Sequence, residues 1–444
     1  MKKHLVSLLL FIFIVLCIPF SPTYAAKAKA PEISASSAIL IDAETGYALY
    51  SKNATRKMYP ASTTKIISYL VISDAIENGE LALEDMLVFT REMQDNMDPT
   101  GSHIELEAGE EMSAENLIRA MLIASGNDAA TLLAATVGGN EQGFVKRMNK
   151  KADQLGLKNT SFTNSHGLTD DKHYTTAEDL ATAARIAMQD EFFRDIVSSQ
   201  TLTIAPTNMR VEERYFINTN NLISPLRYSQ YYYPKATGIK TGYTSAAGSC
   251  LVASAKEKER ELICVVLKSE TSHEDAKALL EFGFKNFRQV KVATKNDIVG
   301  EVKVKQGAGG NDHIRAVAKK DVVLTLPLNV DIDKINSEIT YKSDEIYAPV
   351  NKGVSLGTIT YFYKERPVGS TDIVAEKNIK RHLFGFMMTL GEIIWGSIIV
   401  RIIVYLILII VFLFILLVAY GFYRSIKRSR ARKRRRAKYR PPMY

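Results

Sequence analysis

The sequence contains little cysteine, with 3 residues among 444, which excludes a small scaffold built on disulfides. Cys17 falls within an apolar N-terminal stretch, so only Cys250 and Cys264 remain for the rest of the chain. These two lie on apolar runs that a short charged turn joins into a hairpin, and strand side chains alternate between faces. We therefore predict two buried thiols on opposite faces of the hairpin, with a disulfide between them as the alternative.

Histidine is also scarce, with 7 residues. None of them forms a metal-ligand pattern such as His-Glu-x-x-His, so we expect neither a metal nor another cofactor. His166 lies in a polar loop and would be a candidate catalytic base. Because no acidic partner accompanies it in the sequence, we predict that His166 has a structural role.

The N-terminus has the pattern of a secretory signal at residues 1–25. Lys2 and Lys3 precede an apolar stretch at 5–18, and Ala25 ends a plausible cleavage site. This order of a charged start, an apolar core and small residues is typical of exported proteins. A retained membrane anchor is the alternative.

The C-terminal part combines a long apolar run with a basic tail. Residues 402–420 carry no charge, which predicts a transmembrane helix at 402–423. The tail at 424–444 has 11 basic residues and no acidic one. The positive-inside rule therefore predicts a single-pass protein of the cell membrane, with a cytoplasmic tail near anionic lipid and the rest of the chain outside. Nucleic-acid binding by the tail is the less favoured alternative.

The segment between the folded part and this helix is amphipathic. Residues 379–400 contain several Leu, Phe, Met and Ile side chains and one tryptophan, and few charges. We predict a helix that lies at the membrane interface. A second membrane crossing is the alternative, disfavoured by Glu392 and Arg401.

The pattern between the two ends changes near residue 290. Before it, apolar runs of strand length alternate with longer amphipathic runs, so we expect an α+β domain at 33–288. After it, short β-type runs alternate with turns, which indicates a small all-β domain at 290–378. The predicted strands are 37–42, 47–52, 238–244, 248–255, 261–267, 299–304, 314–318, 322–326, 338–342 and 357–363. The predicted helices begin at 62, 113, 129, 144, 175 and 275.

The stretch at 59–65 carries the first candidate catalytic residues. Pro60 and small or hydroxylated residues precede an apolar run at helical spacing, so Ser62 lies at or near a helix N-terminus. Lys65 follows one turn later on the same face, within reach of the serine. A serine attacks only when a base takes its proton, and a lysine is a base only as a free amine. Burial and the helix N-terminus both lower its pKa.

Two later stretches place polar residues next to predicted helices and strands. Ser125-Gly126-Asn127 is a polar turn wedged between two apolar helices, where buried side chains need partners; helix capping is the alternative. Lys240-Thr241-Gly242 lies on a strand that approaches a hairpin. Lys240 and Thr241 would hold a carboxylate, and Gly242 would let a substrate backbone lie close to the strand.

The ordered set of the three motifs resembles the active-site signature of penicillin-binding proteins and class A β-lactamases. The chain closely resembles the D-alanyl-D-alanine carboxypeptidases among the low-molecular-mass penicillin-binding proteins, serine peptidase family S11. The likeness covers roughly residues 33–380. It includes the longer stretches 59–66, 125–130, 162–168 and 238–244.

The resemblance implies a fold and a set of roles. The fold is a β-lactamase-like domain with a central antiparallel sheet and helices on both sides, followed by the small β domain. The implied catalytic residues are Ser62 as nucleophile, Lys65 as base and Ser125 as proton relay. Asn127, Lys240, Thr241 and Gly242 would bind substrate, and the backbone N–H groups of Ser62 and Tyr243 would stabilise the oxyanion. The implied substrate is the pentapeptide stem of peptidoglycan, and β-lactams would be covalent inhibitors.

Two other functions share these motifs. A class A β-lactamase needs a glutamate to activate the deacylating water, and no Glu-x-x-Leu-Asn sequence follows Asn127. A membrane-bound β-lactam sensor or cell-wall scaffold would acylate without turnover, but the basic tail is too short to be a signalling domain. We therefore expect a hydrolase that trims the terminal D-alanine.

Overall fold

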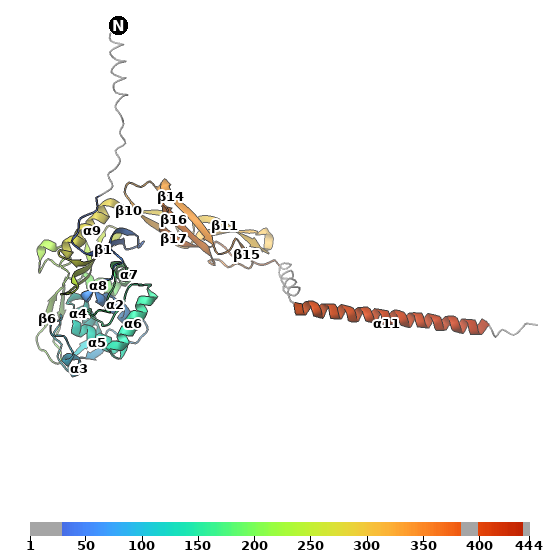
Figure 1. Ribbon diagram of the computed structural model, residues 1–444, viewed down its shortest axis with the longest axis horizontal. Coiled ribbons are helices and arrows are strands. Elements are labelled where there is room, and N and C mark those ends of the chain that lie inside the picture. The colour runs from blue at the N-terminus through green and yellow to red at the C-terminus, as the bar shows by residue number, and fades with distance from the viewer. Residues whose placement is uncertain (1–28, 383–397, 438–444) are drawn as a thin grey trace, which may run out of the picture. The chain divides into compact units, whose positions relative to one another are not determined.

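The structure is a computed structural model that describes residues 29–382 and 398–437 (Figure 1). The described residues fall into two compact units. The first follows the chain as far as Val292 and also includes Val322–Asn336 and Tyr361–Gly369, while the second contains the other described residues.

Some predictions made from the sequence concern residues outside this description. The signal peptide predicted at 1–25 lies there, as does most of the membrane-proximal segment predicted at 379–400. The domain limits 33–288 and 290–378 likewise remain predictions.

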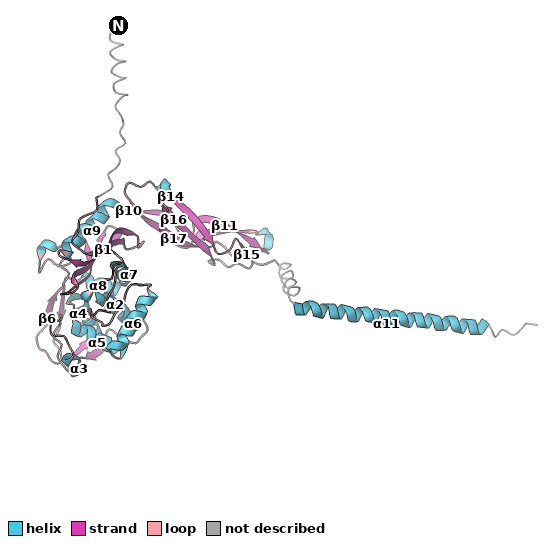
Figure 2. Ribbon diagram, viewed as in Figure 1, coloured by secondary structure: helices cyan, strands magenta, loops and turns pink. Residues whose placement is uncertain are grey.

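A five-stranded antiparallel sheet with the order β2-β1-β9-β8-β7 lies in the first unit. Figure 2 labels one of its strands, β1. All six residues of β1 are buried, because its apolar sequence pairs with strands on both sides. β7 is the last strand in this order and therefore has one edge outside the ladder. The strands are β1 (Ser37–Asp42), β2 (Ala48–Lys52), β7 (Ala236–Thr244), β8 (Gly248–Glu257) and β9 (Arg260–Ser269).

Helices cover both faces of the sheet, which confirms the predicted α+β class. On one face α9 (Ser272–Asn286) packs against β8 and β9. On the other, α7 (Ala177–Ala187) packs against β1 and β9, and α8 (Glu191–Ser198) packs against β7. Two apolar clusters result, one on each side of the sheet.

The two cysteines illustrate the alternation of side chains along this hairpin. Cys250 belongs to the apolar cluster on one face and Cys264 to the cluster on the other. Both are free thiols and buried. The prediction of two separate buried thiols is therefore confirmed, and a disulfide between them is excluded because the sheet separates the side chains.

A group of helices surrounds the catalytic candidate at Lys65. The first of them, α2 (Lys65–Glu77), is apolar on nearly every side and is buried along most of its length. It packs against α4 (Ala114–Ile123), α5 (Asn127–Gly138) and α6 (Glu141–Gln154). A helix without a polar face is stable only inside such a group.

The structure corrects some predicted boundaries in this unit. The helix expected to begin at residue 129 already begins at Asn127, so that the motif residue lies in its first turn. The short amphipathic helix α8 was not predicted. The smaller elements are η1 (Ala61–Thr64), β3 (Met86–Val88), α3 (Arg91–Asp95), β4 (Glu111–Ser113), β5 (Thr201–Ile204), β6 (Arg214–Ile217), η2 (Ser229–Tyr231) and β10 (Phe287–Ala293), where η marks a 3-10 helix.

The C-terminal strands bear out the predicted all-β region. A six-stranded sheet has the order β14-β16-β17-β12-β11-β15, and β13 pairs with β10. The sequence indicated five of these eight strands but not β10, β15 and β17. The elements are β11 (Ile298–Lys305), η3 (Ala308–Gly310), β12 (His313–Ala318), β13 (Val322–Pro327), η4 (Ile332–Lys334), β14 (Ile335–Tyr341), β15 (Glu345–Tyr347), β16 (Ser355–Tyr363) and β17 (Arg366–Ala375).

The last described element is the long helix α11 (Ile398–Ala437). Its segment Arg401–Arg432 is the one helix among the described residues that is long and apolar enough to cross a membrane. The apolar side chains of this segment are exposed, with none of its most apolar stretch buried against the protein. Length and composition thus make α11 a candidate membrane span.

Candidate active site

The first motif lies where η1 passes into α2. Ser62 is the second residue of η1, and Lys65 is the first residue of α2. The turn begins with Ala61 at φ 49, a left-handed conformation that is uncommon for a residue with a side chain. The Lys65 Nζ lies 3.1 Å from the Ser62 Oγ. The predicted contact between serine and lysine is therefore present.

Lys65 is fully buried and surrounded by oxygen atoms. Besides the serine, its Nζ donates to the Asn127 Oδ1 at 2.6 Å and to the His166 carbonyl oxygen at 3.1 Å. These partners come from the N-terminus of α5 and from the loop before α7. Three segments far apart in the sequence therefore meet at one amine.

The electrostatic environment opposes a charge on this amine. Burial, and then the nearby Lys240, hold the pKa of Lys65 well below its usual value, while Asp128 acts in the opposite direction. The predicted depression of the pKa by burial is thus confirmed, and the charge of Lys240 adds to it. The free amine needed for a base is accessible because desolvation disfavours the ammonium form.

The second motif forms the turn between α4 and α5. Ser125 is buried and has φ 64, and the Asn127 N–H donates to the Ser102 carbonyl oxygen at 2.7 Å. A side chain at Gly101 would lie 2.5 Å from the Asn127 Nδ2. Glycine at 101 therefore leaves room for the amide that contacts Lys65.

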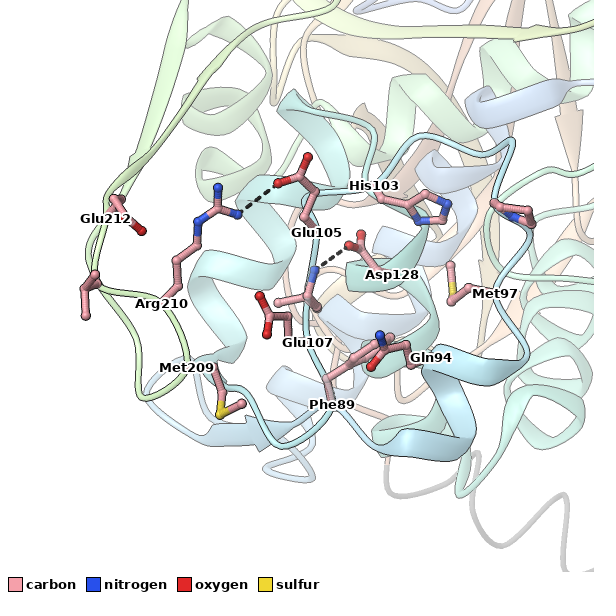
Figure 3. Close-up of a pocket in the computed structure, with 13 residues that line it drawn as sticks. Phe89, Gln94, Met97, His103, Glu105, Glu107, Asp128, Met209, Arg210 and Glu212 are labelled. Atoms are coloured by element: carbon pink, nitrogen blue, oxygen red, sulfur yellow. Dashed lines mark hydrogen bonds and ion pairs between the residues drawn. The ribbon is translucent and has the colours of Figure 1, made fainter.

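Asp128 anchors the neighbouring loop from the same turn. Its carboxylate accepts hydrogen bonds from the N–H groups of Ile104, at 3.1 and 2.9 Å, and Leu106, at 3.1 Å. Asp128 lines a groove of about 710 Å³, in which Arg210 and Glu105 form an ion pair at 2.9 Å. Figure 3 shows these three side chains in the groove. The carboxylate thus fixes the loop that carries Ser102 beside Asn127.

The third motif approaches the serine from β7. A side chain at Gly242 would lie 2.8 Å from the Ser62 backbone nitrogen, so glycine permits the close packing of β7 against η1. The close neighbour of Gly242 in the structure is thus the backbone of the serine, and the approach of a substrate backbone to this glycine stays a prediction. The Thr241 hydroxyl donates to the Thr219 Oγ1 at 2.7 Å. All three motifs thus converge on Ser62 and Lys65.

Lys240 is buried on β7, and its Nζ donates to the Thr241 carbonyl oxygen at 3.0 Å. Burial lowers the pKa of Lys240 to about 7. An anion placed near this amine would stabilise its charged form and raise that pKa again. Tyr243 lies three residues later, near the end of the strand, and has an exposed side chain.

The family assignment follows from comparison with known proteins. Residues 24–271 match the family Peptidase S11, described as D-alanyl-D-alanine carboxypeptidase. The chain belongs to peptidase family S11. Residues 287–381 match a second family, described as the C-terminal domain of penicillin-binding protein 5.

Similar proteins align with this S11 peptidase over most of their length. D-alanyl-D-alanine carboxypeptidase DacF of Bacillus subtilis (strain 168) is 34% identical, with 86% of this chain and 95% of the relative aligned. DacD of Escherichia coli (strain K12) is 30% identical, with coverages of 82% and 89%. The crystal structure of penicillin-binding protein 5 from Haemophilus influenzae has a TM-score of 0.68 and 28% identity, and covers 80% of this chain and 99% of that one.

The S11 site also contains residues outside the three motifs, and one of them, His166, has the structural role predicted for it. His166 contributes its carbonyl oxygen to Lys65, and burial lowers the pKa of its imidazole to about 3, so the ring is neutral. Ser102 and Thr219 support the second and third motifs through the bonds described above. No local sequence signal identifies Ser102 and Thr219, because each acts across a long sequence separation.

Proposed function

We propose that this S11 peptidase is a serine-type D-Ala-D-Ala carboxypeptidase that removes the terminal D-alanine from peptidoglycan stem peptides through an acyl-enzyme on Ser62. The observation that carries the proposal is the buried Lys65 amine, 3.1 Å from the Ser62 hydroxyl and depressed in pKa. The names of the relatives support the substrate class.

The proton chemistry follows from the three oxygens around Lys65. A neutral amine has two N–H bonds and one lone pair. The two N–H bonds are directed to the Asn127 and His166 oxygens, so the lone pair is left for the Ser62 proton. Lys65 thus takes that proton as Ser62 attacks the carbonyl carbon between the two D-alanines.

The substrate is held from the β7 side. Lys240 and Thr241 bind the terminal carboxylate, and Asn127 orients the substrate amide through its remaining amide group. The N–H groups of Ser62 and Tyr243 stabilise the oxyanion. The position of β7 at the edge of the sheet supports this arrangement, since its outer backbone groups lack a strand partner within the sheet.

The reaction then completes in two steps. The C–N bond breaks as Ser125 passes a proton to the nitrogen of the departing D-alanine, which leaves an ester on Ser62. Water hydrolyses this ester and restores the serine. β-Lactams present a similar carbonyl and carboxylate, so they acylate the same hydroxyl.

We also propose that the enzyme is anchored by α11 and works outside the cytoplasm. The length of its apolar segment and the basic residues that follow support a single span with a cytoplasmic tail near anionic lipid. Protease treatment of intact spheroplasts should remove the catalytic part and protect the tail. Protection of the catalytic part would reverse the assigned orientation.

The test of the catalytic proposal is release of D-alanine from a synthetic peptide ending in D-Ala-D-Ala. The wild-type protein should release it and be labelled by a fluorescent penicillin, while Ser62→Ala should do neither. Rapid hydrolysis of a chromogenic cephalosporin without D-alanine release would indicate a β-lactamase. Stable labelling without any turnover would indicate a sensor.

A further inference from the structure

A chain of hydrogen bonds leads from a buried histidine to the nucleophile turn. The Thr163 N–H donates to the His173 Nδ1 at 3.1 Å, and the Thr64 Oγ1 lies 2.9 Å from the His173 Nε2. The Thr64 hydroxyl donates to the Ala61 carbonyl oxygen at 2.8 Å. Thr64 and His173 are both buried.

This chain has one consistent direction. Since a backbone N–H can only donate, the His173 Nδ1 is an acceptor, and in the neutral ring Nε2 then carries the proton. Burial lowers the pKa of His173 to about 4, so the neutral ring is the form present at neutral pH. Nε2–H therefore donates to Thr64, whose own proton is left to point at Ala61.

The receiving carbonyl belongs to a peptide unit with a second function. The Ala61 C=O and the Ser62 N–H lie on one planar trans peptide and point in opposite directions. Fixing the carbonyl oxygen therefore fixes the direction of the Ser62 N–H. That nitrogen faces β7, where a side chain at Gly242 would come within 2.8 Å of it.

Gly167 packs closely against the same carbonyl group. A side chain at Gly167 would lie 1.9 Å from the Ala61 oxygen and 2.9 Å from the Thr64 Oγ1. The loop thus packs directly on the peptide that Thr64 binds. Ala61 itself has φ 49, a conformation that persists only when its surroundings impose it.

We propose that His173 is a positioning residue, which acts through Thr64 to hold the Ala61–Ser62 peptide with its N–H directed at the oxyanion. The inference rests on the proposed function, because it assigns the Ser62 N–H as an oxyanion donor. His173 does not touch the substrate. It preorganises one of the two donors before the substrate arrives.

The neighbouring threonine offers a matched control. Thr63 is equally buried, and its hydroxyl donates to the Pro60 carbonyl oxygen at 2.6 Å. That carbonyl belongs to the peptide before Ala61 and not to the one that carries the Ser62 N–H. Thr63→Val and Thr64→Val therefore remove similar hydroxyls from the same turn, but only Thr64→Val breaks the chain.

The experiment measures penicillin acylation of the full-length protein in detergent for both variants. Loss of an oxyanion donor lowers rates by about 10²–10³-fold, so its misalignment in Thr64→Val should slow the acylation step by about tenfold to a hundredfold. The noncovalent affinity for penicillin should stay unchanged, as should the pH midpoint of acylation. Thr63→Val should acylate within about threefold of the wild type, with a similar loss of melting temperature.

Two histidine variants complete the test. His173→Phe should behave like Thr64→Val, whereas His173→Gln retains an N–H near the Nε2 position and should recover most of the rate. Equal rates for Thr63→Val and Thr64→Val, or a shifted pH midpoint in Thr64→Val, would overturn the inference. Wild-type protein that is acylated but releases no D-alanine would instead overturn the proposed carboxypeptidase function and leave this comparison intact.

Discussion

Two buried lysines lie in the candidate active site, and their surroundings differ. Lys65 contacts three oxygens from three segments, and its pKa is lowered both by burial and by the second lysine. Lys240 has one acceptor among the described residues, the Thr241 carbonyl oxygen, and burial alone lowers its pKa to about 7. The two lysines are equally buried, but they suit different tasks. The Lys65 amine contacts three oxygens, which suits proton transfer, whereas the Lys240 amine has one acceptor among the described residues, which suits the binding of an anion.

The largest effect should come from replacing Lys65. Lys65→Ala removes the base and should slow acylation by about 10³-fold, since base catalysis and positioning are both lost. Lys65→Arg keeps a cation but cannot become neutral, so it should be nearly as slow. Penicillin labelling rates of the two variants test this, and substantial recovery by arginine would show that charge and not basicity is needed.

Replacement of Lys240 should have a smaller and different effect. Lys240→Met removes the anchor for the substrate carboxylate and should lower kcat/KM for the peptide by about 10²-fold, on the scale of a charged hydrogen bond. Because the Lys240 charge lowers the pKa of Lys65, its loss raises that pKa, and the rising limb of the acylation profile should move to higher pH. An unmoved limb would show that the two lysines are not coupled. Lys256→Met, on the exposed end of β8, is the control.

Gly242→Ala tests the contact between η1, which carries Ser62, and β7, which carries Lys240. The added methyl group would lie 2.8 Å from the Ser62 nitrogen, so β7 or η1 must shift. Acylation should slow by about tenfold, on the low side of the cost of losing one oxyanion donor, while the protein remains folded. The comparison variant is Gly101→Ala, which crowds the Asn127 amide and not the Ser62 N–H. Unimpaired acylation in Gly242→Ala would mean that the two regions move independently.

The smallest effect is expected at Thr219, which accepts a hydrogen bond from Thr241 in the third motif. Thr219→Val removes the acceptor of the Thr241 hydroxyl but leaves that hydroxyl in place. One neutral hydrogen bond contributes about 1 kcal/mol, so KM for the peptide should rise a few-fold with kcat unchanged. A fall in kcat with constant KM would assign Thr219 to the chemical step instead.

The sequence predicted the three motifs because each lies on a recognisable element. The apolar run after Lys65 predicted a helix, and the pattern around Lys240 predicted a strand that approaches a hairpin. The roles of these residues stay predictions, although the distances bring them together. The family and the two-sided sheet, by contrast, are confirmed by the comparisons and the fold.

Other parts of the site could not be predicted because their contribution comes from the backbone or from distant segments. His166 acts through a carbonyl, which any residue possesses, and His173 reaches Thr64 across 109 positions. The early start of α5 at Asn127 has a similar cause, since Ser102 satisfies its N–H from another loop. The eight residues of α8 were too few for a clear period in the sequence.

The packing of η1 on β7 covers a face of the strand and not its edge. A side chain at Gly242 would leave the strand perpendicular to the sheet, and this direction leads to the Ser62 nitrogen and the Pro60 carbonyl oxygen. The backbone groups along the outer edge of β7 lie in the plane of the sheet and are not covered by this contact. Because an extended chain pairs with a sheet through such an edge, the nucleophile reaches the strand without blocking the addition of a further strand.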